Sequence, residues 1–253
     1  MSTRPAYLTA TLAKGLDVLE ALSEVEETGL SELARKLGVS NPTLFRILAT
    51  LGARGYVRKS PPGRYRLTLK PWEIGAKAVR RIRLRDVARP FVERLAAATR
   101  ETVHLSVLEG DGIVIIDKLD SSHPVRVDTY LGLRAPAHCS ATGKAILAFL
   151  PAAALAEILP RQLARHTAAT IADRAAFERE LAEVRRAGWA KNREEWRDGV
   201  CAAAVPIFAS DATVAASLSV TVPTPRFTQM AVREKLVPAL KKAGAALSAQ
   251  LRA

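Results

Sequence analysis

The sequence has 253 residues, of which 49% are hydrophobic. This length exceeds the usual domain size of about 100–150 residues, so we expect two domains, and the hydrophobic fraction excludes a disordered chain. Lysine and arginine total 38 against 25 acidic residues, and this net charge of +13 favours a polyanionic partner. Residues 1–85 hold 16 basic and 7 acidic residues, a balance of +9, so most of the excess lies in the first third of the chain.

The cysteine content and the apolar runs indicate where the protein resides. Two cysteines, Cys139 and Cys201, are too few for a disulfide framework and favour a reducing compartment. The first ten residues lack the apolar core of a signal peptide. The longest apolar run, 145–156, contains Pro151 and is shorter than the roughly 20 residues that a membrane helix needs. We therefore expect a cytoplasmic protein with no membrane partner.

The first half of the N-terminal region shows helical spacing. Residues 11–23 place Leu12, Leu16, Leu19 and Leu22 three or four positions apart, and residues 30–37 repeat this pattern up to Gly38, a typical helix-ending glycine. A further helix is predicted over 41–52, with Ser40 as its N-terminal cap. The spacing therefore predicts a helix, a glycine-containing turn and a second helix.

After Gly55 the hydrophobic period changes from nearly four to two. Residues 56–59 and 64–70 are predicted strands, and the sequence Ser-Pro-Pro-Gly at 60–63 is typical of a turn between them. Arg64, Arg66 and Lys70 share one face of the second strand, so the hairpin is basic. Helix-turn-helix and hairpin together predict a winged helix-turn-helix, followed by a connecting helix over 72–85.

Polar and basic side chains gather where such a motif would meet DNA. Side chains that bond base edges or phosphates occupy the exposed face of the second helix and the hairpin. The predicted DNA-binding residues are Ser40, Asn41, Thr43, Arg46, Arg54, Arg58, Lys59, Arg64 and Arg66. Exposed arginines also occur simply for solubility. Because the turn chemistry, the helical faces, the basic hairpin and the charge distribution agree, we favour binding to double-stranded operator DNA.

The rest of the chain alternates helices and strands. Helices are expected over 86–99, 143–150, 175–187 and 229–251, and strands over 101–109, 112–119, 125–129, 199–208 and 213–222. This order indicates an α+β sensor-like domain. The predicted organisation is a DNA-binding domain at 1–72, a linker helix at 73–86 and an effector-binding and oligomerisation domain at 87–253.

Nearly the whole chain resembles the IclR (isocitrate lyase regulator) family of bacterial transcription factors. The resemblance rests on segments whose order and spacing match the family: 15–22, 33–38, 43–51, 55–57, 64–67, 101–105, 137–145, 199–203 and 215–220. It implies a winged helix-turn-helix, a linker helix and a GAF-like effector-binding domain, in a homodimer or homotetramer on palindromic DNA. Asn41-Pro42 departs from the Lys-Ser-like pair that is common in the family, so base specificity does not transfer at these positions.

The resemblance also implies a pocket for a small organic acid, which is aromatic in many members. Carried over by position, the effector-binding candidates are Ser140, Ala141, Thr142, Cys201, Ser217, Ser219 and Thr221. Hydroxyl groups and amides before a helix suit a carboxylate. The family also uses the segment at Lys191-Asn192, where acidic residues are usual. Each candidate could equally be a small residue packed in a strand.

Catalytic and metal chemistry find little support in the sequence. His138 and Cys139 are adjacent, and in an extended chain neighbouring side chains point to opposite faces, so no nucleophile pair is expected. Four scattered histidines show no ligand spacing, so no metal site and no cofactor are expected. Two alternatives remain: a small-molecule enzyme tethered to nucleic acid by its basic N-terminal domain, and a DNA-architectural protein that binds no ligand.

Overall fold

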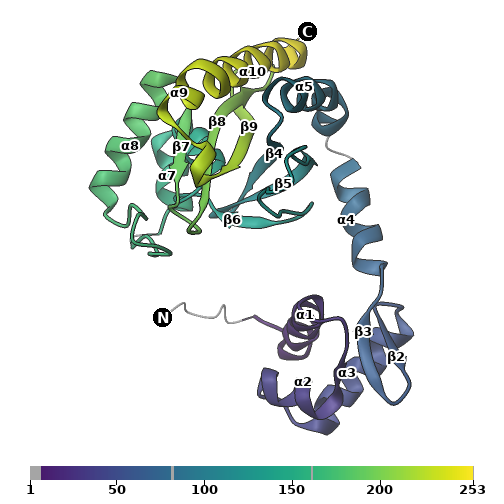
Figure 1. Ribbon diagram of the computed structural model, residues 1–253. Helices are drawn as coiled ribbons and strands as arrows, with labels where there is room; N and C mark the ends of the chain where they lie inside the picture. Colours follow the sequence, from purple (N-terminus) through teal and green to yellow (C-terminus); the bar gives the residue numbers. More distant parts are fainter. Residues whose placement is uncertain (1–6, 81–82, 161, 253) are drawn as a thin grey trace. The chain divides into compact units, whose positions relative to one another are not determined.

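The computed structural model describes residues 7–80, 83–160 and 162–252. These residues form two compact units that divide near residues 81 and 82 (Figure 1). Residues 81 and 82, which fall inside the predicted linker helix, lie outside the described residues. In the part of the chain that is described, no helix is both long and apolar enough to cross a membrane.

Unit 1 is a winged helix-turn-helix, as the sequence predicted. Its elements are α1 (Ala10–Ser23), β1 (Thr28–Gly29), α2 (Leu30–Leu37), α3 (Asn41–Ala53), β2 (Val57–Ser60), β3 (Arg64–Leu67) and α4 (Lys70–Arg80). The strands form an antiparallel sheet in the order β1-β3-β2. Gly38 ends α2 with φ of 64°, a left-handed conformation that glycine adopts without strain.

The core of unit 1 is formed by one face of each of its first three helices. Val18 and Leu22 of α1 pack in one cluster with Leu33 of α2, Leu44 of α3 and Tyr65 of β3. The apolar stripe expected along α1 is only partly buried. Leu12 is 64% and Leu16 is 53% exposed, because the core meets only the second half of the helix.

Unit 2 is an α+β domain built on one antiparallel sheet. Its elements are α5 (Leu84–Thr99), β4 (Thr102–Glu109), β5 (Gly112–Leu119), β6 (Arg134–Pro136), α6 (Ala141–Leu147), α7 (Ala152–Ile158), α8 (Arg174–Ala187), β7 (Ala190–Arg193), β8 (Val200–Phe208), β9 (Val214–Pro223) and a C-terminal helical region. That region comprises a short 3-10 turn (Thr224–Arg226), α9 (Gln229–Ala231), a π-helical turn (Val232–Leu236) and α10 (Val237–Arg252). The strand order is β6-β5-β4-β9-β8-β7, and the α+β prediction is confirmed.

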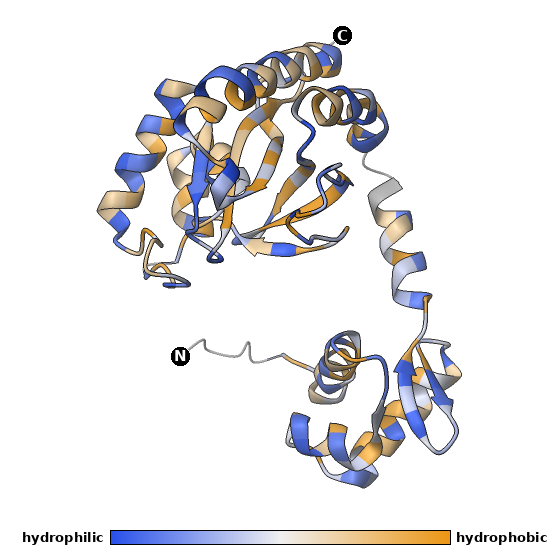
Figure 2. Ribbon diagram, viewed as in Figure 1, coloured by the Kyte–Doolittle hydropathy of each residue, from blue (hydrophilic) through white to orange (hydrophobic). Residues whose placement is uncertain are grey.

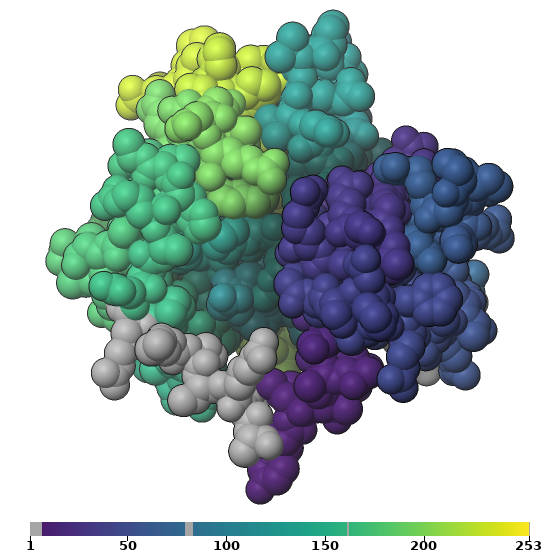
Figure 3. All heavy atoms as spheres, turned by 90° about the horizontal axis from the view of Figure 1, so that it is seen from below, coloured from purple at the N-terminus to yellow at the C-terminus, as the bar shows by residue number. Residues whose placement is uncertain are grey.

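The two faces of this sheet are covered by different helices. Ala202 and Ala204 of β8 pack with Ala141 and Ala145 of α6. Val205 points the other way and meets Gly244 of α10, which lies beside α5 (Figure 1). The central strands of the sheet are mainly hydrophobic (Figure 2). The surface of unit 2 is made of segments that lie far apart in its sequence (Figure 3). Alternation along each strand therefore assigns each residue to one of two cores.

One predicted strand, 125–129, is not a strand in the structure. The edge of β5 is instead paired with β6, where Ile113 lies opposite Ala135. The 125–129 segment forms no ladder with the described strands, and Val125 is 69% exposed. Only Thr129 of this segment is buried, and it bonds to a side chain of β4.

Gly143 generates a test of the packing in unit 2. A Cβ atom at this position would lie 2.1 Å from the Ala137 carbonyl oxygen, a backbone atom that cannot rotate away. We expect Gly143→Ala to lower the free energy of unfolding by about 1–3 kcal/mol, measured by chemical denaturation. Gly15→Ala is the control, since its Cβ would meet nothing within 4 Å and alanine favours a helix. Equal stabilities of the two variants would contradict this packing.

Candidate DNA interface and effector cavity

Helix α3 buries one face in the core of unit 1 and exposes the other face to solvent. Leu44, Ile47 and Leu48 are buried, whereas Asn41 and Arg46 are exposed. Ser40 occupies the N-cap position, as predicted, but its hydroxyl makes no capping bond to a backbone amide of the helix. The hydroxyl contacts the Thr43 hydroxyl instead (2.9 Å). The exposed face thus carries groups able to bond base edges or phosphates.

Phe45 is a residue of this face that the sequence analysis missed. Its ring is 53% exposed, and it directly precedes Arg46, which is also exposed, on the same helix. It also lines a surface groove between α3 and the hairpin, together with Ala49 and Tyr65. An exposed aromatic ring on such a helix can contact the methyl group of thymine. The sequence does hold a signal for it. Phe45 directly follows Leu44 and falls outside the three- and four-residue spacing of the buried apolar residues, which predicts an exposed ring.

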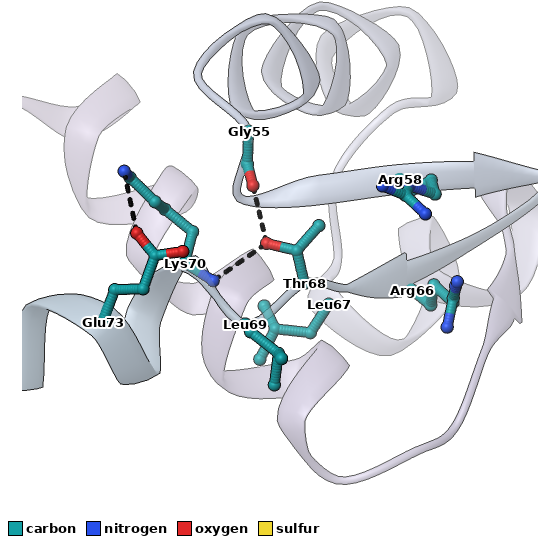
Figure 4. A pocket seen from close by; sticks show the side chains of 8 residues that line it. All are labelled: Gly55, Arg58, Arg66, Leu67, Thr68, Leu69, Lys70 and Glu73. Carbon is teal, nitrogen blue, oxygen red and sulfur yellow. Dashed lines mark hydrogen bonds and ion pairs between the residues drawn. The ribbon is translucent and has the colours of Figure 1, made fainter. Parts of the chain in front are cut away.

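The hairpin holds two arginines directly opposite each other. Arg58 of β2 pairs in register with Arg66 of β3, and both side chains are exposed. Figure 4 shows them on neighbouring strands. They line a hollow at the base of the hairpin, which has a volume of about 520 Å³. Like charges at facing positions of an antiparallel pair destabilise it. An anion that lies between the two guanidinium groups would offset this repulsion, so the pair is a candidate anion-binding site.

The base of the hairpin is fixed by hydrogen bonds around Thr68. Its hydroxyl donates to the Gly55 carbonyl (2.6 Å) and accepts from the Lys70 amide (3.1 Å), as Figure 4 shows. Lys70 in turn pairs with Glu73 in the first turn of α4. These contacts hold the end of β3 against the end of α3.

The other predicted basic residues divide into two groups. Arg54 and Lys59 are exposed, and the Lys59 ammonium lies over the Tyr65 ring at 5.7 Å from its centre. Arg64 is half-buried and engaged within the fold, since its guanidinium contacts the Glu27 carboxylate (2.8 Å) and donates to the Glu27 carbonyl (3.0 Å). Arg64 therefore attaches β3 to the segment that precedes β1.

A cavity in unit 2 lies on the α6 side of the sheet. It has a volume of about 60 Å³, well below the roughly 300–1,000 Å³ of typical ligand pockets. Its lining residues come from the strands, the start of α6 and the loops around 127–129 and 196–197: His104, Ser106, Ile113, Ile115, Val127, Asp128, Thr129, Leu133, Ala135, Ser140, Thr142, Asn192, Trp196, Arg197, Val200 and Thr221. A ligand of more than a few atoms would have to displace the loop residues.

Three of the seven effector candidates line this cavity: Ser140, Thr142 and Thr221. Ser140 caps α6, accepting the Gly143 amide at 3.0 Å. Ser219 lies on the same sheet face as Thr221 and is buried, and its hydroxyl has no partner among the described residues, but it does not line the cavity. The remaining candidates, Ala141, Cys201 and Ser217, are buried elsewhere.

Cys201 lies on the opposite side of the sheet from the cavity. It pairs in register with Val222, one position away from Thr221, and strand alternation therefore turns it to the other face. Its thiol contacts the Thr224 hydroxyl at 3.4 Å. Ser217 is used structurally, since its hydroxyl donates to the Val205 carbonyl at 2.9 Å. Within the 190–193 strand, Asn192 faces the cavity and Lys191 is exposed.

His104 is the central polar side chain of the cavity and was absent from the predicted set. Its two ring nitrogens contact the hydroxyls of Thr129 (2.9 Å) and Thr221 (3.2 Å). Burial, followed by the nearby Lys118 charge, lowers the pKa of His104 to about 4. The ring is therefore neutral at neutral pH and contributes hydrogen bonds without charge.

A buried ion pair holds the wall of the cavity together. Lys144 of α6 has no exposed surface, and its ammonium group donates to Glu195 (2.7 and 3.0 Å) and to Glu180 of α8 (3.0 Å). Burial raises the pKa of Glu195, and the Lys144 charge opposes that shift. The Glu195 amide donates to Asn192, and the Thr170 hydroxyl donates to the Glu195 carbonyl. Residues 192–197 are thereby placed beside α6.

His138 and Cys139 occupy a turn between β6 and α6, not the extended segment on which the sequence argument relied. Their ligand atoms and those of His166 lie within 4.8 Å of one another. Burial raises the pKa of the Cys139 thiol to about 12, so the thiol is protonated at neutral pH. The expectation that these side chains point apart was wrong, because a turn does not alternate as a strand does.

The Lys144 pair generates a stability test. We expect Glu195→Gln to lower the free energy of unfolding by about 1.5–3 kcal/mol, because it leaves a buried cation with Glu180 as its single carboxylate. Glu178→Gln is the control, since Glu178 forms an exposed pair with Arg174 (2.7 Å) and should change stability by less than about 0.5 kcal/mol. A loss at Glu195 no greater than at Glu178 would show that the buried pair contributes little.

Comparisons with known proteins agree with both units. The family model described as the IclR helix-turn-helix domain matches residues 11–61, and that of the bacterial transcriptional regulator IclR C-terminal region matches residues 76–249. The HTH-type transcriptional regulator KdgR of Escherichia coli (strain K12) is 34% identical over 244 residues, covering 96% of this chain and 92% of KdgR.

Solved structures give the same result. The IclR of Thermotoga maritima has a TM-score of 0.78 and 29% identity, covering 97% of this chain and 100% of its own. An IclR homologue from Microbacterium hydrocarbonoxydans, in complex with 4-hydroxybenzoate, has a TM-score of 0.80 and 27% identity, covering 96% of this chain and 99% of its own. This chain therefore belongs to the IclR family of bacterial DNA-binding transcriptional regulators.

Proposed function

We propose that this chain binds double-stranded operator DNA through α3 and the β2–β3 hairpin, and that a small organic acid in the unit 2 cavity controls this binding. The observation that carries the proposal is the facing pair of Arg58 and Arg66, which costs stability unless an anion lies against it. Phosphates of the DNA backbone supply that anion, while Asn41, Phe45 and Arg46 of α3 meet base edges in the major groove.

The division of labour between helix and hairpin can be measured. We expect Arg46→Ala to weaken binding to the DNA upstream of the protein's own gene by about 1–3 kcal/mol and to leave binding to random DNA nearly unchanged. Arg58→Ala and Arg66→Ala should weaken both and reduce the dependence of log K on log salt concentration by about 1 each. Fluorescence anisotropy at several salt concentrations gives both quantities.

Arg179→Ala is the matched control, because Arg179 is exposed on α8 in unit 2 and should affect neither measurement. Arg64→Ala is informative separately: its contacts with Glu27 lead us to expect a loss of stability in addition to any loss of DNA affinity. The proposal would be contradicted by a wild-type chain that binds the upstream fragment and random DNA equally at physiological salt.

The charges at the mouth of the cavity favour a hydroxy acid. Arg197 and Asp128 both line it and both are exposed, whereas the groups deeper inside, His104 and Thr142, are uncharged hydrogen-bonding partners. A guanidinium suits a carboxylate and a carboxylate accepts from a hydroxyl. The structural relative from Microbacterium hydrocarbonoxydans holds 4-hydroxybenzoate, an acid with both groups. We therefore assign the carboxylate of the effector to Arg197 and its hydroxyl to Asp128, two residues of the loops that would have to move to admit the ligand.

This assignment is tested with ligands that differ by one group. At about 100 times its dissociation constant, a hydroxy acid such as 4-hydroxybenzoate should raise the melting temperature by roughly 5–10 °C, and benzoate should raise it less. Arg197→Gln should abolish the shift, whereas Arg193→Gln, an exposed position on β7 outside the cavity, should retain it. Equal shifts in both variants would overturn the role of Arg197.

Exposed apolar side chains in unit 1 support a homodimer or homotetramer. Leu12 and Leu16 of α1, and Trp72 (57% exposed) and Ile74 (47%) of α4, lie on the surface. A second copy of the chain would cover them, and a dimer also matches the two-fold symmetry of palindromic operators.

The same proposal places the chain among regulators and not enzymes. Cys139, the candidate nucleophile beside the cavity, is a buried thiol whose raised pKa keeps it protonated at neutral pH. The lowered pKa of His104 makes it a weak base. We retain as part of the proposal the functional division at 1–72, 73–86 and 87–253 and a cytoplasmic site of action.

A further inference from the structure

A cluster of two histidines and one cysteine in unit 2 lies outside the cavity described above. Cys139 and His138 are buried in the turn before α6, and His166 is exposed in the segment that follows α7. Three potential ligand atoms, one from each residue, lie within 4.8 Å of one another. None of the three residues lines the cavity that ends at Ser140 and Thr142.

A backbone hydrogen bond sets the tautomer of the His138 ring. One ring nitrogen, Nε2, lies 2.9 Å from the Ala164 carbonyl oxygen. A carbonyl only accepts, so Nε2 carries the proton and Nδ1 keeps its lone pair. Phe177 also packs edge-on against this ring, with 6.3 Å between ring centres. A second-sphere hydrogen bond to a backbone carbonyl is what fixes the tautomer of histidine ligands in metal sites.

The segment that carries His166 is also fixed in place. Its amide and that of Thr167 both donate to the Thr170 hydroxyl, at 3.0 and 2.8 Å. That hydroxyl donates to the Glu195 carbonyl (2.6 Å), and the Thr167 hydroxyl donates to the Glu194 carbonyl (2.6 Å). The backbone of His166 is thus positioned, while its exposed side chain can turn towards the other two.

We propose that His138, Cys139 and His166 form a binding site for one zinc ion. Imidazole and thiolate are borderline and soft ligands that suit late first-row transition metals, and this set contains none of the carboxylates that calcium or magnesium would need. Three protein ligands leave the fourth position of the tetrahedron to water, on the exposed His166 side. Metal–ligand distances of about 2.0–2.3 Å require the three atoms to approach one another by roughly 1 Å. The exposed side chain of His166 can rotate to supply part of this approach.

Binding converts the thiol of Cys139 into a thiolate bound to the metal and releases one proton to solvent. The ion would join the turn before α6 to the segment between α7 and α8. Because the next residues, Ser140 and Thr142, line the cavity, the same turn serves two sites. The proposal does not depend on the identity of the effector or on DNA binding.

Cobalt(II) reports directly on the ligands. The untagged, chelator-treated full chain should bind one Co²⁺ with a near-ultraviolet thiolate-to-metal charge-transfer band and the visible bands of tetrahedral cobalt, and Zn²⁺ should bleach both. Cys139→Ser should remove the charge-transfer band. His166→Ala, an exposed change that should leave the melting temperature of the metal-free chain unaltered, should weaken binding at least about 10-fold.

Two matched variants separate this site from incidental binding. Cys201→Ser removes the other cysteine, and His123→Ala removes a histidine outside the cluster, so both should bind Co²⁺ as the wild type does. If no charge-transfer band forms, or if the band survives in Cys139→Ser, the proposal fails. Unchanged affinity in His166→Ala would also overturn it.

Discussion

The ammonium group of Lys144 is enclosed by protein on all sides, and this constrains much of unit 2. Removing a charge from water costs several kcal/mol, so the fold must supply partners wherever this side chain is buried. The partners, Glu180 and Glu195, lie on a helix and a loop, 36 and 51 residues after Lys144. When they close around Lys144, α6, α8 and the 192–197 segment come together. The backbone of Glu195 then fixes Asn192 and Thr170, so one buried charge organises the cavity wall and the neighbouring His166 segment.

Several features of unit 1, in contrast, lower the stability of the fold. A bound partner would explain them. Arg58 faces Arg66 across the hairpin, Phe45 exposes its ring beside Arg46, and the first half of α1 leaves leucines in solvent. A fold selected for stability alone would have placed opposite charges on the hairpin and polar residues on α1. Binding to DNA, together with the association of copies that we propose, would account for these features. Arg64 differs from its basic neighbours, since its ion pair with Glu27 belongs to the fold.

The sequence predicted unit 1 well because its signals are local. Gly38, the 3–4 spacing of α2 and α3, and the change to period two after Gly55 each act within a few residues. The cavity was harder to predict. Thr142 and Ser140 were found through the family pattern, but Cys201 was placed in the cavity although its strand face turns it away. His104 and Arg197 were missed, because no local spacing relates β4, β9 and the 192–197 loop. The His138–Cys139–His166 cluster escaped for the same reason: a turn and a distant loop bring it together.

The two faces of the unit 2 sheet also bear on how such a protein can change over evolutionary time. On β4 and β9, His104 and Thr221 face the cavity, while Leu105 and Val220, their neighbours in sequence, face the other core. In the effector site that we propose, substitutions at the first set would alter which small molecule fits and leave the packing beneath α5 and α10 intact. Because alternation separates the two sets residue by residue, a lineage could exchange one metabolite for another through a handful of changes while its scaffold stays constant. Duplicated genes of this architecture would then diverge first in what they sense.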